Sequence, residues 1–582
     1  MISIIISPKF NKENILSIHL ENKDKKDFKN IKICFSLVYS VKSLKGASII
    51  KQVGRYYELK LKNKDLLLNE KYKINIELQT PRIGTYNLSC GPEGLFVLDE
   101  NDNLIQSELE TLIFDRPIKK KFYEEINYEI INPIIPEPLK INLSSNFLEN
   151  SDKNFFSKNK ELQNICHSLK STTKKLGFDF NSNKGIEIKY SKVKMLEDEY
   201  KIIINSQNVI VYSSGYGGSF YALVSILQLA YYYLGSLPIG KIEDKPKFSW
   251  RGMHLDCSRQ FHSIDRIKRL LIYMSLFKLN RFHWHLTDNE AWRLDLESFP
   301  NLAKKTSFRG YKQVIPPFYG SGYQKSGGYY LKEDVKKLII FAKNLNIEIM
   351  PEIDLPAHSW ALLQIIPELY DCSSNIESQD VGNYKNNTIN PALTSTWNFI
   401  KKIIKEISDL FSYDIIHVGM DERPKLAWQG SQKITKMMKE KNLLSHEEVQ
   451  DFYMNKLINL IKVENKISAA WNEAVISPHT DNGSGGGKGN IDKNCLIFAW
   501  EHPDVALQLV KKGFHTVLCP GQKTYFDMAY NNSTEERGIC WASTIEVEDV
   551  HSWKPLENID NNFHYLILGI QGQLWSETLT EK

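Results

Sequence analysis

Two adjacent carboxylates are the strongest candidates for chemistry in this sequence. Asp421 and Glu422 directly follow the apolar run DIIHVGM, which also contains His417. A lone Asp-Glu pair is more often two solvated surface acids, but this pair comes where a predicted buried strand ends. In such a place, one acid can transfer a proton while its neighbour stabilises charge. We therefore take Asp421 and Glu422 as the candidate catalytic pair.

Carboxylates and tryptophans also close most of the other apolar runs between residues 247 and 582. These runs include FSWRGMHLDCS, RFHWHLTD, IEIMPEIDLP, ISAAWNE, LIFAWE and LILGIQGQLWSE. Carboxylic acids protonate a glycosidic leaving oxygen and stabilise oxocarbenium charge, and indole faces bind sugar rings. The combination favours cleavage of a glycosidic bond. The further acids at the strand ends are Asp256, Asp288, Asp354, Glu473, Glu501 and Glu577.

A metal site is the competing interpretation. In His283-Trp284-His285 the two imidazoles lie on one face of a strand, because side chains alternate along it. A metal-dependent barrel hydrolase would use such a pair on its first strand, with histidines at later strands. Here the pair falls on the second strand, and the later strands end in Trp, Asn and Glu. We expect the histidines to pack and hydrogen-bond around the acids, and we predict neither a metal nor another cofactor.

The elements that must position these residues form a barrel. From residue 247 to 582, eight short apolar runs alternate with amphipathic helical stretches, such as SHEEVQDFYMNKLINLIK with its capping pair Ser445 and Glu448. This alternation predicts a (β/α)₈ barrel, whose chemistry gathers at the carboxyl ends of the strands. The sequence stops at Lys582, a few residues after the eighth strand, so we expect the last helix to be missing.

Two further units precede the barrel. Residues 1–120 alternate apolar and polar positions in short runs, which predicts a small β-sandwich. Residues 138–245 predict an α/β domain in which the apolar stretch GYGGSFYALVSILQLAYYYL forms a helix buried against a sheet. Two glycine-rich stretches, GYGG at 215–218 and GSGGGKG at 483–489, lack the full pattern of a phosphate-binding loop. We expect a turn at the first and a flexible loop at the second.

Composition excludes several classes of protein. The 582 residues carry 74 Lys+Arg and 69 Asp+Glu, and 42% are hydrophobic, which is typical of globular domains and argues against nucleic-acid binding. No apolar run is long enough to span a membrane. Eight scattered cysteines without CxxC argue against a disulfide framework. The opening MISIIIS is too short for a signal-peptide core, so we expect a cytoplasmic protein, or a secreted or periplasmic one if the N-terminus is incomplete.

In order, the strand-end motifs resemble those of the β-N-acetylhexosaminidases of glycoside hydrolase family 20, chitobiase-like bacterial members included. The matching stretches are WRGMHLDCSR, HWHLTDNEAWR, PEIDLPAH, HVGMDE, AWNEA, FAWE, TYFDMAY and LWSE. The resemblance covers the barrel and, more weakly, residues 138–245, which look like the family's accessory α/β domain. Met420 departs from a glycine common in the family, and Asn289 with Glu290 departs from Asp and Gln.

The resemblance implies a role for each matching residue. Glu422 would be the general acid/base, Asp421 would orient the substrate's 2-acetamido group, and Tyr525 would bind its carbonyl oxygen. Arg251 would bind the hydroxyls on C3 and C4, and Asp527 with Glu577 would hold the C4 and C6 oxygens. The acetamide pocket would be walled by Trp471, Trp500, Trp575 and, by a looser match, Trp553. The residues that tune the acid pair would be Asp288, His358 and His417.

The activity implied is exo-acting and retaining, with the acetamido oxygen as the nucleophile. The expected substrate is an oligosaccharide or glycoconjugate with a terminal β-linked N-acetylglucosamine or N-acetylgalactosamine, and the oligomeric state stays open. Two alternatives remain: a catalytically inactive sugar-binding relative and a metal-dependent barrel hydrolase.

Overall fold

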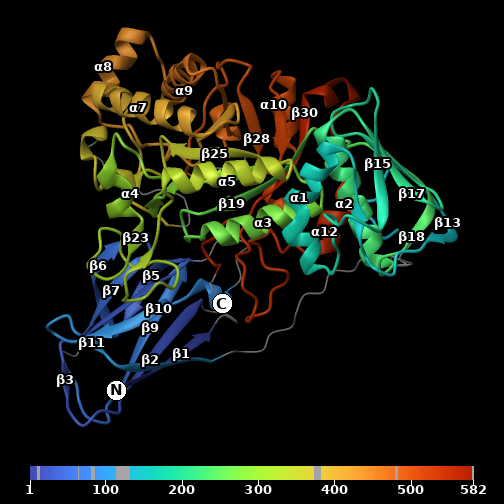
Figure 1. Cartoon of the computed structure of the whole chain (residues 1–582). Coiled ribbons are helices and arrows are strands. Elements are labelled where there is room, and N and C mark those ends of the chain that lie inside the picture. Colours follow the sequence, from blue (N-terminus) through green and yellow to red (C-terminus); the bar gives the residue numbers. More distant parts are fainter. Residues whose placement is uncertain are drawn as a thin grey trace.

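The computed structural model describes most of the 582-residue chain and shows three units (Figure 1). The described residues are 1–9, 14–62, 65–79, 86–112, 132–371, 382–478 and 483–579. The end of the predicted 1–120 sandwich and Cys372 therefore lie outside them. The seven described cysteines are free thiols, all of them buried.

The N-terminal unit is a sandwich of two five-stranded sheets. In β9 (Lys71–Gln79), Ile74, Ile76 and Leu78 are buried while the residues between them are more exposed. This alternation lets the inner faces of two sheets enclose one core. One sheet contains β12 (Ser107–Thr111), β1 (Ile2–Lys9), β2 (Ile15–Asn22), β9 and β5 (Ser40–Lys45), in that order. The other contains β11 (Leu104–Ile105), β10 (Glu93–Leu98), β4 (Lys32–Ser36), β7 (Tyr56–Leu61) and β6 (Ala47–Val53).

The second unit is a six-stranded mixed sheet with two helices, α1 (Lys160–Lys175) and α2 (Tyr216–Tyr232). Most of α2 is buried, as expected for a helix that is apolar nearly all round. One side packs on the sheet, and Gln228 on the other side donates to the Leu276 carbonyl of the barrel at 2.8 Å. The sheet order is β13 (Lys140–Leu148), β18 (Leu237–Asp244), β16 (Tyr200–Ile204), β17 (Asn208–Ser213), β15 (Ile186–Lys192) and β14 (Phe155–Phe156).

The third unit is a closed barrel of eight parallel strands, so the predicted fold class is confirmed. Its strands are β19 (Trp250–Asp256), β20 (Arg281–His285), β25 (Glu348–Leu355), β26 (Ile415–Gly419), β27 (Ile467–Trp471), β28 (Leu496–Ala499), β29 (Thr516–Leu518) and β30 (Ile567–Gly572). The main helices outside it are α3 (Ile264–Leu276), α4 (Pro300–Thr306), α5 (Lys332–Asn344), α7 (Thr394–Leu410), α8 (Gln432–Lys441), α9 (His446–Val463) and α10 (Val505–Lys511).

Local signals account for several helix starts. Ser445 caps α9, and its side chain accepts from the Glu448 N–H as predicted. Ser263 caps α3 in the same way. No helix follows β30 in the described residues, which end at Leu579. No described helix is both long enough and apolar enough to cross a membrane.

The two N-terminal units contact opposite ends of the barrel, on different sides of it in Figure 1. The α/β unit meets the amino ends of the strands, where Tyr216 donates to the Asn344 carbonyl at 2.8 Å just before β25. The sandwich meets loops that follow the strands, where Asn87 donates to the Gly538 carbonyl at 2.5 Å. The sandwich therefore flanks the end of the barrel at which the strand-end acids lie.

Candidate active site

The acid pair lies immediately after β26, where the chain leaves strand geometry. The strand ends at Gly419, as predicted, and Met420 and Glu422 then adopt positive φ angles of 81° and 46°. Neighbouring side chains of an extended strand point to opposite faces, so this break allows Asp421 and Glu422 to face the same site. Non-glycine residues at positive φ are uncommon and cluster at functional sites.

Gly419 is required by a close approach. Its φ is +72°, and a Cβ there would lie 1.7 Å from Oδ1 of Asp354 at the end of β25. The Asp354 carboxyl is buried, and burial with the charge of Asp421 raises its pKa well above the ordinary value. The bare backbone of Gly419 therefore lets the Asp354 carboxyl pack directly beneath the acid pair.

His358 links the acid pair to Asp288. Its Nε2 lies 3.5 Å from both Asp421 Oδ2 and Glu422 Oε2, and its Nδ1 lies 2.9 Å from Asp288 Oδ1. Burial alone would lower the pKa of His358, but the carboxylates of Asp288, Asp354 and Asp421 outweigh it and raise this pKa well above the ordinary value. A positively charged imidazole therefore bridges the two candidate catalytic acids.

A buried histidine cluster around Glu352 lies below this bridge. His285 Nδ1 is 2.6 Å and His283 Nε2 is 3.1 Å from Glu352 Oε2, and His417 Nδ1 is 3.0 Å from Oε1. His285 hydrogen-bonds to Glu352, and His283 and His417 pack against it, as predicted for histidines around acids. His417 is fully buried and contacts Glu352 rather than the acid pair. His285 Nε2 lies 3.0 Å from Asp288 Oδ2, so the cluster is continuous with the His358 bridge.

Burial sets the charge of Asp421. The residue is 7% exposed, and burial, opposed by His358 and reinforced by Glu352 and Glu422, raises its pKa to about 6. Oδ1 of Asp421 has no hydrogen-bond partner among the described residues. Glu422 is more exposed, with 22% of its side-chain surface accessible against 10% for Asp421. Glu422 is therefore the acid better placed to reach a bound molecule.

Aromatic rings that follow four strands, β27 to β30, gather at the mouth of the barrel. The rings of Trp471 and Trp575 are 6.0 Å apart, and Tyr525 lies 6.3 Å from both Trp575 and Trp500, stacked on the latter. The Trp500 indole is anchored by a 2.8 Å hydrogen bond to Glu473. Burial raises the pKa of Tyr525 well above its ordinary value, so its hydroxyl is a neutral donor. The structure thus brings together four of the five predicted aromatic residues.

Two further acids, Asp527 and Glu577, are buried on the same side. Both oxygens of Asp527 and Oε2 of Glu577 lack hydrogen-bond partners among the described residues. Burial raises the pKa of Glu577 to about 7, and burial with the charge of Glu577 raises that of Asp527 well above normal. Unsatisfied buried carboxyl oxygens are costly, which makes them candidates for binding hydroxyl groups.

Arg251 is not in this cluster, which corrects the sequence-based assignment. It is the second residue of β19, about 16 Å from the carboxyl end at ~3.3 Å per residue. Its guanidinium donates to Asp198 Oδ2 and the Tyr221 hydroxyl of the α/β unit, both at 2.9 Å. Arg251 therefore joins two units at the far end of the barrel.

Arg259 is the arginine that the structure brings to the acids. It follows β19 in the DCSR stretch, and its Nη2 lies 2.7 Å from Asp288 Oδ2. Its Nε lies 3.0 Å from Glu290 Oε2, and its guanidinium lies 5.1 Å from the Trp575 ring. Nη1 is buried without a hydrogen-bond partner among the described residues. The sequence could have indicated Arg259, because it lies three residues after Asp256 and residues that follow the strands of a barrel lie at its mouth.

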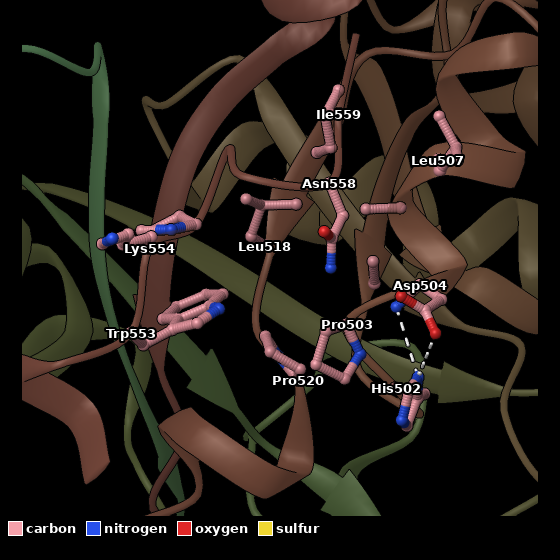
Figure 2. A pocket seen from close by; sticks show the side chains of 13 residues that line it. His502, Pro503, Asp504, Leu507, Leu518, Pro520, Trp553, Lys554, Asn558 and Ile559 are labelled. Carbon is pink, nitrogen blue, oxygen red and sulfur yellow. Dashed lines mark hydrogen bonds and ion pairs between the residues drawn. The ribbon is translucent and has the colours of Figure 1, made fainter.

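Trp553 does not lie in the aromatic group either, which corrects its assignment to the acetamide pocket. Trp541 lies beside Trp500 and Tyr525 instead. Figure 2 shows Trp553 beside Pro520 and Lys554, lining a separate cavity of about 30 Å³ that also borders His502 and Asp504. The ring of Trp541 instead lies 5.7 Å from both Trp500 and Tyr525, edge-on to each. Trp541 lies far along the loop between β29 and β30 rather than directly after a strand, so a search of strand ends does not predict it.

Comparison with known proteins identifies the family. Residues 248–582 match the family described as "Glycosyl hydrolase family 20, catalytic domain", which is more than half of the chain. The chain belongs to glycosyl hydrolase family 20.

Relatives within this family differ in length from the chain. It is 33% identical to a beta-hexosaminidase of Vibrio furnissii over 391 residues, which are 66% of this chain and 62% of that protein. It is 27% identical to an N,N'-diacetylchitobiase of Vibrio harveyi in an alignment 461 residues long. That alignment covers 65% of this chain and 52% of that protein. The chain thus spans about half to two thirds of these curated relatives.

A solved family 20 structure matches the whole chain. It is the exo-β-N-acetylglucosaminidase from Vibrio harveyi in complex with N-acetylglucosamine, with a TM-score of 0.86 and 25% sequence identity. The match covers 100% of this chain and 91% of that one, so the shared architecture includes the sandwich.

In this family 20 chain, the glycine-rich stretch 483–489 is packed rather than flexible, which corrects the prediction. The Gly485 N–H donates to the Arg423 carbonyl at 2.7 Å, and Ser484 bridges to Pro424. A Cβ on Gly485 would lie 2.3 Å from Nη2 of Arg423. The stretch therefore backs the turn that carries Glu422, and its glycines permit the close contact.

The buried histidines also present donor sets that could hold a metal. His254, His285 and Glu352, and separately His283, Glu352 and His417, place their donor atoms within 4.8 Å of one another. Burial raises the pKa of Glu352, but the three neighbouring histidines outweigh burial and hold this pKa well below its ordinary value. The charged carboxylate is therefore already matched by imidazole contacts within the protein.

Proposed function

We propose that this protein is an exo-acting, retaining β-N-acetylhexosaminidase that releases terminal β-linked N-acetylglucosamine or N-acetylgalactosamine. The observation that carries the proposal is the pair Asp421 and Glu422, placed together after β26 and bridged by His358. The indoles around the pair and the names of the family 20 relatives support it.

In the proposed reaction, Glu422 is the general acid and Asp421 is the charge stabiliser. Glu422 protonates the leaving glycosidic oxygen and later removes a proton from the attacking water. Asp421 orients the acetamido N–H with its unpartnered Oδ1 and stabilises the positive charge that develops on the acetamido group. His358, which contacts both carboxyl groups, holds them at a fixed position relative to each other.

The nucleophile in this reaction is the substrate's own acetamido oxygen. Held near the anomeric carbon, it attacks intramolecularly, which carries a large effective-molarity advantage. Tyr525 donates to this oxygen, and Trp471, Trp500 and Trp575 enclose the acetamide and the sugar ring. The enzyme then needs no carboxylate nucleophile, as in the substrate-assisted exceptions among glycosidases.

The remaining polar groups bind hydroxyls at the far side of the terminal sugar. Arg259 offers Nη1, which lies 3.6 Å from Asp256 but has no hydrogen-bond partner among the described residues. Asp527 and Glu577 offer carboxyl oxygens that likewise lack such partners there. With raised pKa values, Asp527 and Glu577 can act as acceptors and, when protonated, as donors. Trp471 is fully buried and donates to Glu352 at 2.7 Å, and this packed core behind the acids supports attack at chain ends only.

Two other functions make different predictions. A catalytically inactive sugar-binding relative would bind N-acetylglucosamine without turnover, and the intact acid pair with Tyr525 speaks against it. A metal-dependent hydrolase, for which the histidine donor sets are the supporting observation, would lose activity to chelators and regain it with metal.

A paired assay tests the proposal. Aryl β-N-acetylglucosaminide and aryl β-N-acetylgalactosaminide should both be cleaved, while the corresponding glucoside and galactoside, which lack the acetamido group, should not. The sugar released should first appear as the β-anomer. Equal cleavage of the glucoside, or release of the α-anomer, would overturn the proposal.

A further inference from the structure

A buried cluster joins the N-terminal sandwich to the mouth of the barrel. We call it the interdomain cluster, and all of its core members are buried. The sandwich contributes Cys34, Tyr56, Phe96 and Leu98, and barrel loops contribute Ile315, Phe318, Tyr319, Ala361 and Tyr384.

The contacts in this cluster concentrate on the loop between α4 and α5. Tyr56 of β7 packs edge-to-face on Phe318, with ring centroids 6.4 Å apart. Phe96 of β10 packs on Tyr311 and Tyr323 at 5.8 and 5.6 Å. Since edge-to-face pairs add stability beyond the area they bury, the sandwich fixes the path of this loop.

The same loop reaches the candidate active site through Tyr319. Its hydroxyl donates to Glu290 Oε1 at 2.8 Å, and the other oxygen of Glu290 lies 3.0 Å from Nε of Arg259. Gln260, next to Arg259, donates to the Tyr319 carbonyl at 3.1 Å. Tyr319 has a φ of 47°, a conformation that persists only where surrounding contacts impose it.

Arg259 needs such support because four carboxyl groups compete for it. Asp288 and Glu290 make ion pairs with its Nη2 and Nε at 2.7 and 3.0 Å, Oδ2 of Asp256 lies 3.6 Å from Nη1, and the charge of Glu577 also acts on it. The hydroxyl of Tyr319 anchors Glu290, which in turn engages Nε. This arrangement leaves Nη1, buried and without a hydrogen-bond partner among the described residues, for a ligand.

We propose that the sandwich is a working part of the active site, acting through Phe318 and Tyr319 to orient Arg259. Tyr319 is then a positioning residue for binding of the sugar's hydroxyls. The inference rests on the proposed function for its substrate, an N-acetylhexosaminide, while the packing path itself does not depend on which sugar is bound.

The first test is Tyr319→Phe, which keeps the ring in the cluster and removes only the hydroxyl. KM for an aryl N-acetylglucosaminide should rise roughly tenfold, the usual worth of a hydrogen bond to a charged group. kcat should stay within about twofold and the pH profile of kcat should be unchanged, because the acid pair is untouched. Tyr72→Phe, which removes a sandwich hydroxyl bonded to the Gly46 carbonyl, is the control and should leave KM unchanged.

The second test compares Tyr56→Ala with Tyr57→Ala. Both side chains are fully buried on β7, but Tyr56 enters the interdomain cluster. Tyr57 packs instead within the sandwich, where its ring lies 6.1 Å from that of Phe35 and its hydroxyl accepts from the Val41 N–H at 3.3 Å. Only Tyr56→Ala should raise KM and speed hydrogen exchange in segments 256–260 and 308–330. The double variant Tyr56→Ala/Tyr319→Phe should have the KM of Tyr319→Phe alone, because residues on one path are not additive.

The outcomes separate this inference from the proposed function. If the wild type cleaves the substrate and Tyr319→Phe keeps KM within twofold, the inference is wrong and the proposed function stands. Equal effects of Tyr56→Ala and Tyr57→Ala would also overturn it. If the wild type cleaves no N-acetylhexosaminide, the proposed function fails, and faster exchange in 256–260 for Tyr319→Phe and Tyr56→Ala but not Tyr57→Ala would still support the positioning path.

Discussion

At the scale of single residues, the account depends on a division of labour between two neighbouring acids. Glu422 is the more exposed of the pair and Asp421 the more buried, although they are adjacent in sequence. The left-handed backbone at Met420 and Glu422 lets both side chains reach the same site, since a regular strand would point them to opposite faces.

Replacing the general acid should affect substrates unequally. Glu422→Gln should lower kcat about 10²–10⁴-fold, the usual contribution of a positioned general acid. The loss should be greater for N-acetylglucosamine oligosaccharides than for aryl glycosides whose leaving groups need little protonation. Steady-state kinetics on both substrates check this, and an equal loss on both would reject the assignment of Glu422 as the acid.

The buried Asp421 predicts an acidic limb in the pH profile. It must be ionised to stabilise positive charge, and burial raises its pKa from 3.8 to about 6. Below about pH 6, kcat/KM should therefore fall roughly tenfold per pH unit as Asp421 becomes protonated, and it should level off above that pH. Asp421→Asn should lower activity and abolish this limb. A limb that persists in Asp421→Asn would assign the titration to another group.

At the scale of elements, the ends of the strands decide what each residue can do. Most of the barrel could be predicted from sequence, because apolar runs of strand length alternate with amphipathic helices and each run ends in an acid or an indole. Arg251 was misassigned because the run that carries it has an arginine near each end, and only the strand boundaries show that Arg259 is at the mouth.

Loops were harder to predict for a physical reason. Trp541 and Tyr319 reach the site from loops whose paths are fixed by contacts far away in sequence, and no local period encodes such contacts. Likewise, the glycines at 483–489 suggested flexibility, since sequence alone does not distinguish a free loop from one packed against Arg423.

The close approach of β25 and β26 predicts a severe effect at Gly419. Gly419→Ala would place a Cβ 1.7 Å from Asp354 Oδ1 and would force the acid-bearing turn to move. Displacements of about 1 Å can cost ~10²-fold in rate, so we expect at least that loss in kcat. Gly513→Ala is the control, because it has a similar φ of +84° with nothing within 4 Å. If both variants lose activity equally, the contact with Asp354 is not the cause.

At the scale of the whole molecule, the barrel is supported from both ends. The α/β unit meets the amino ends of the strands through Arg251, and the sandwich meets the mouth through the interdomain cluster. The two interfaces should therefore have different consequences, one for stability alone and the other for substrate binding.

The amino-end interface gives a stability prediction. Arg251→Met would leave the mostly buried Asp198 without its charged partner. Removing one partner of a buried ion pair costs roughly 3–5 kcal/mol, and we expect less here because both groups keep some exposure. We expect a lower melting temperature with KM unchanged, whereas Arg259→Lys should raise KM strongly. Thermal melts and kinetics of the two variants check this, and a raised KM in Arg251→Met would restore it as a candidate sugar ligand.

The central claim is that the substrate's acetamido oxygen is the nucleophile, and fluorination of its methyl group tests it most directly. Each fluorine withdraws electron density from that oxygen while barely changing the shape held by Trp471, Trp500 and Trp575. With the chemical step shown to be rate-limiting, kcat should fall steeply from the acetyl through the mono- and difluoroacetyl to the trifluoroacetyl substrate. Turnover of the trifluoroacetyl substrate equal to that of the parent would contradict the account, and an enzyme carboxylate would then have to be the nucleophile.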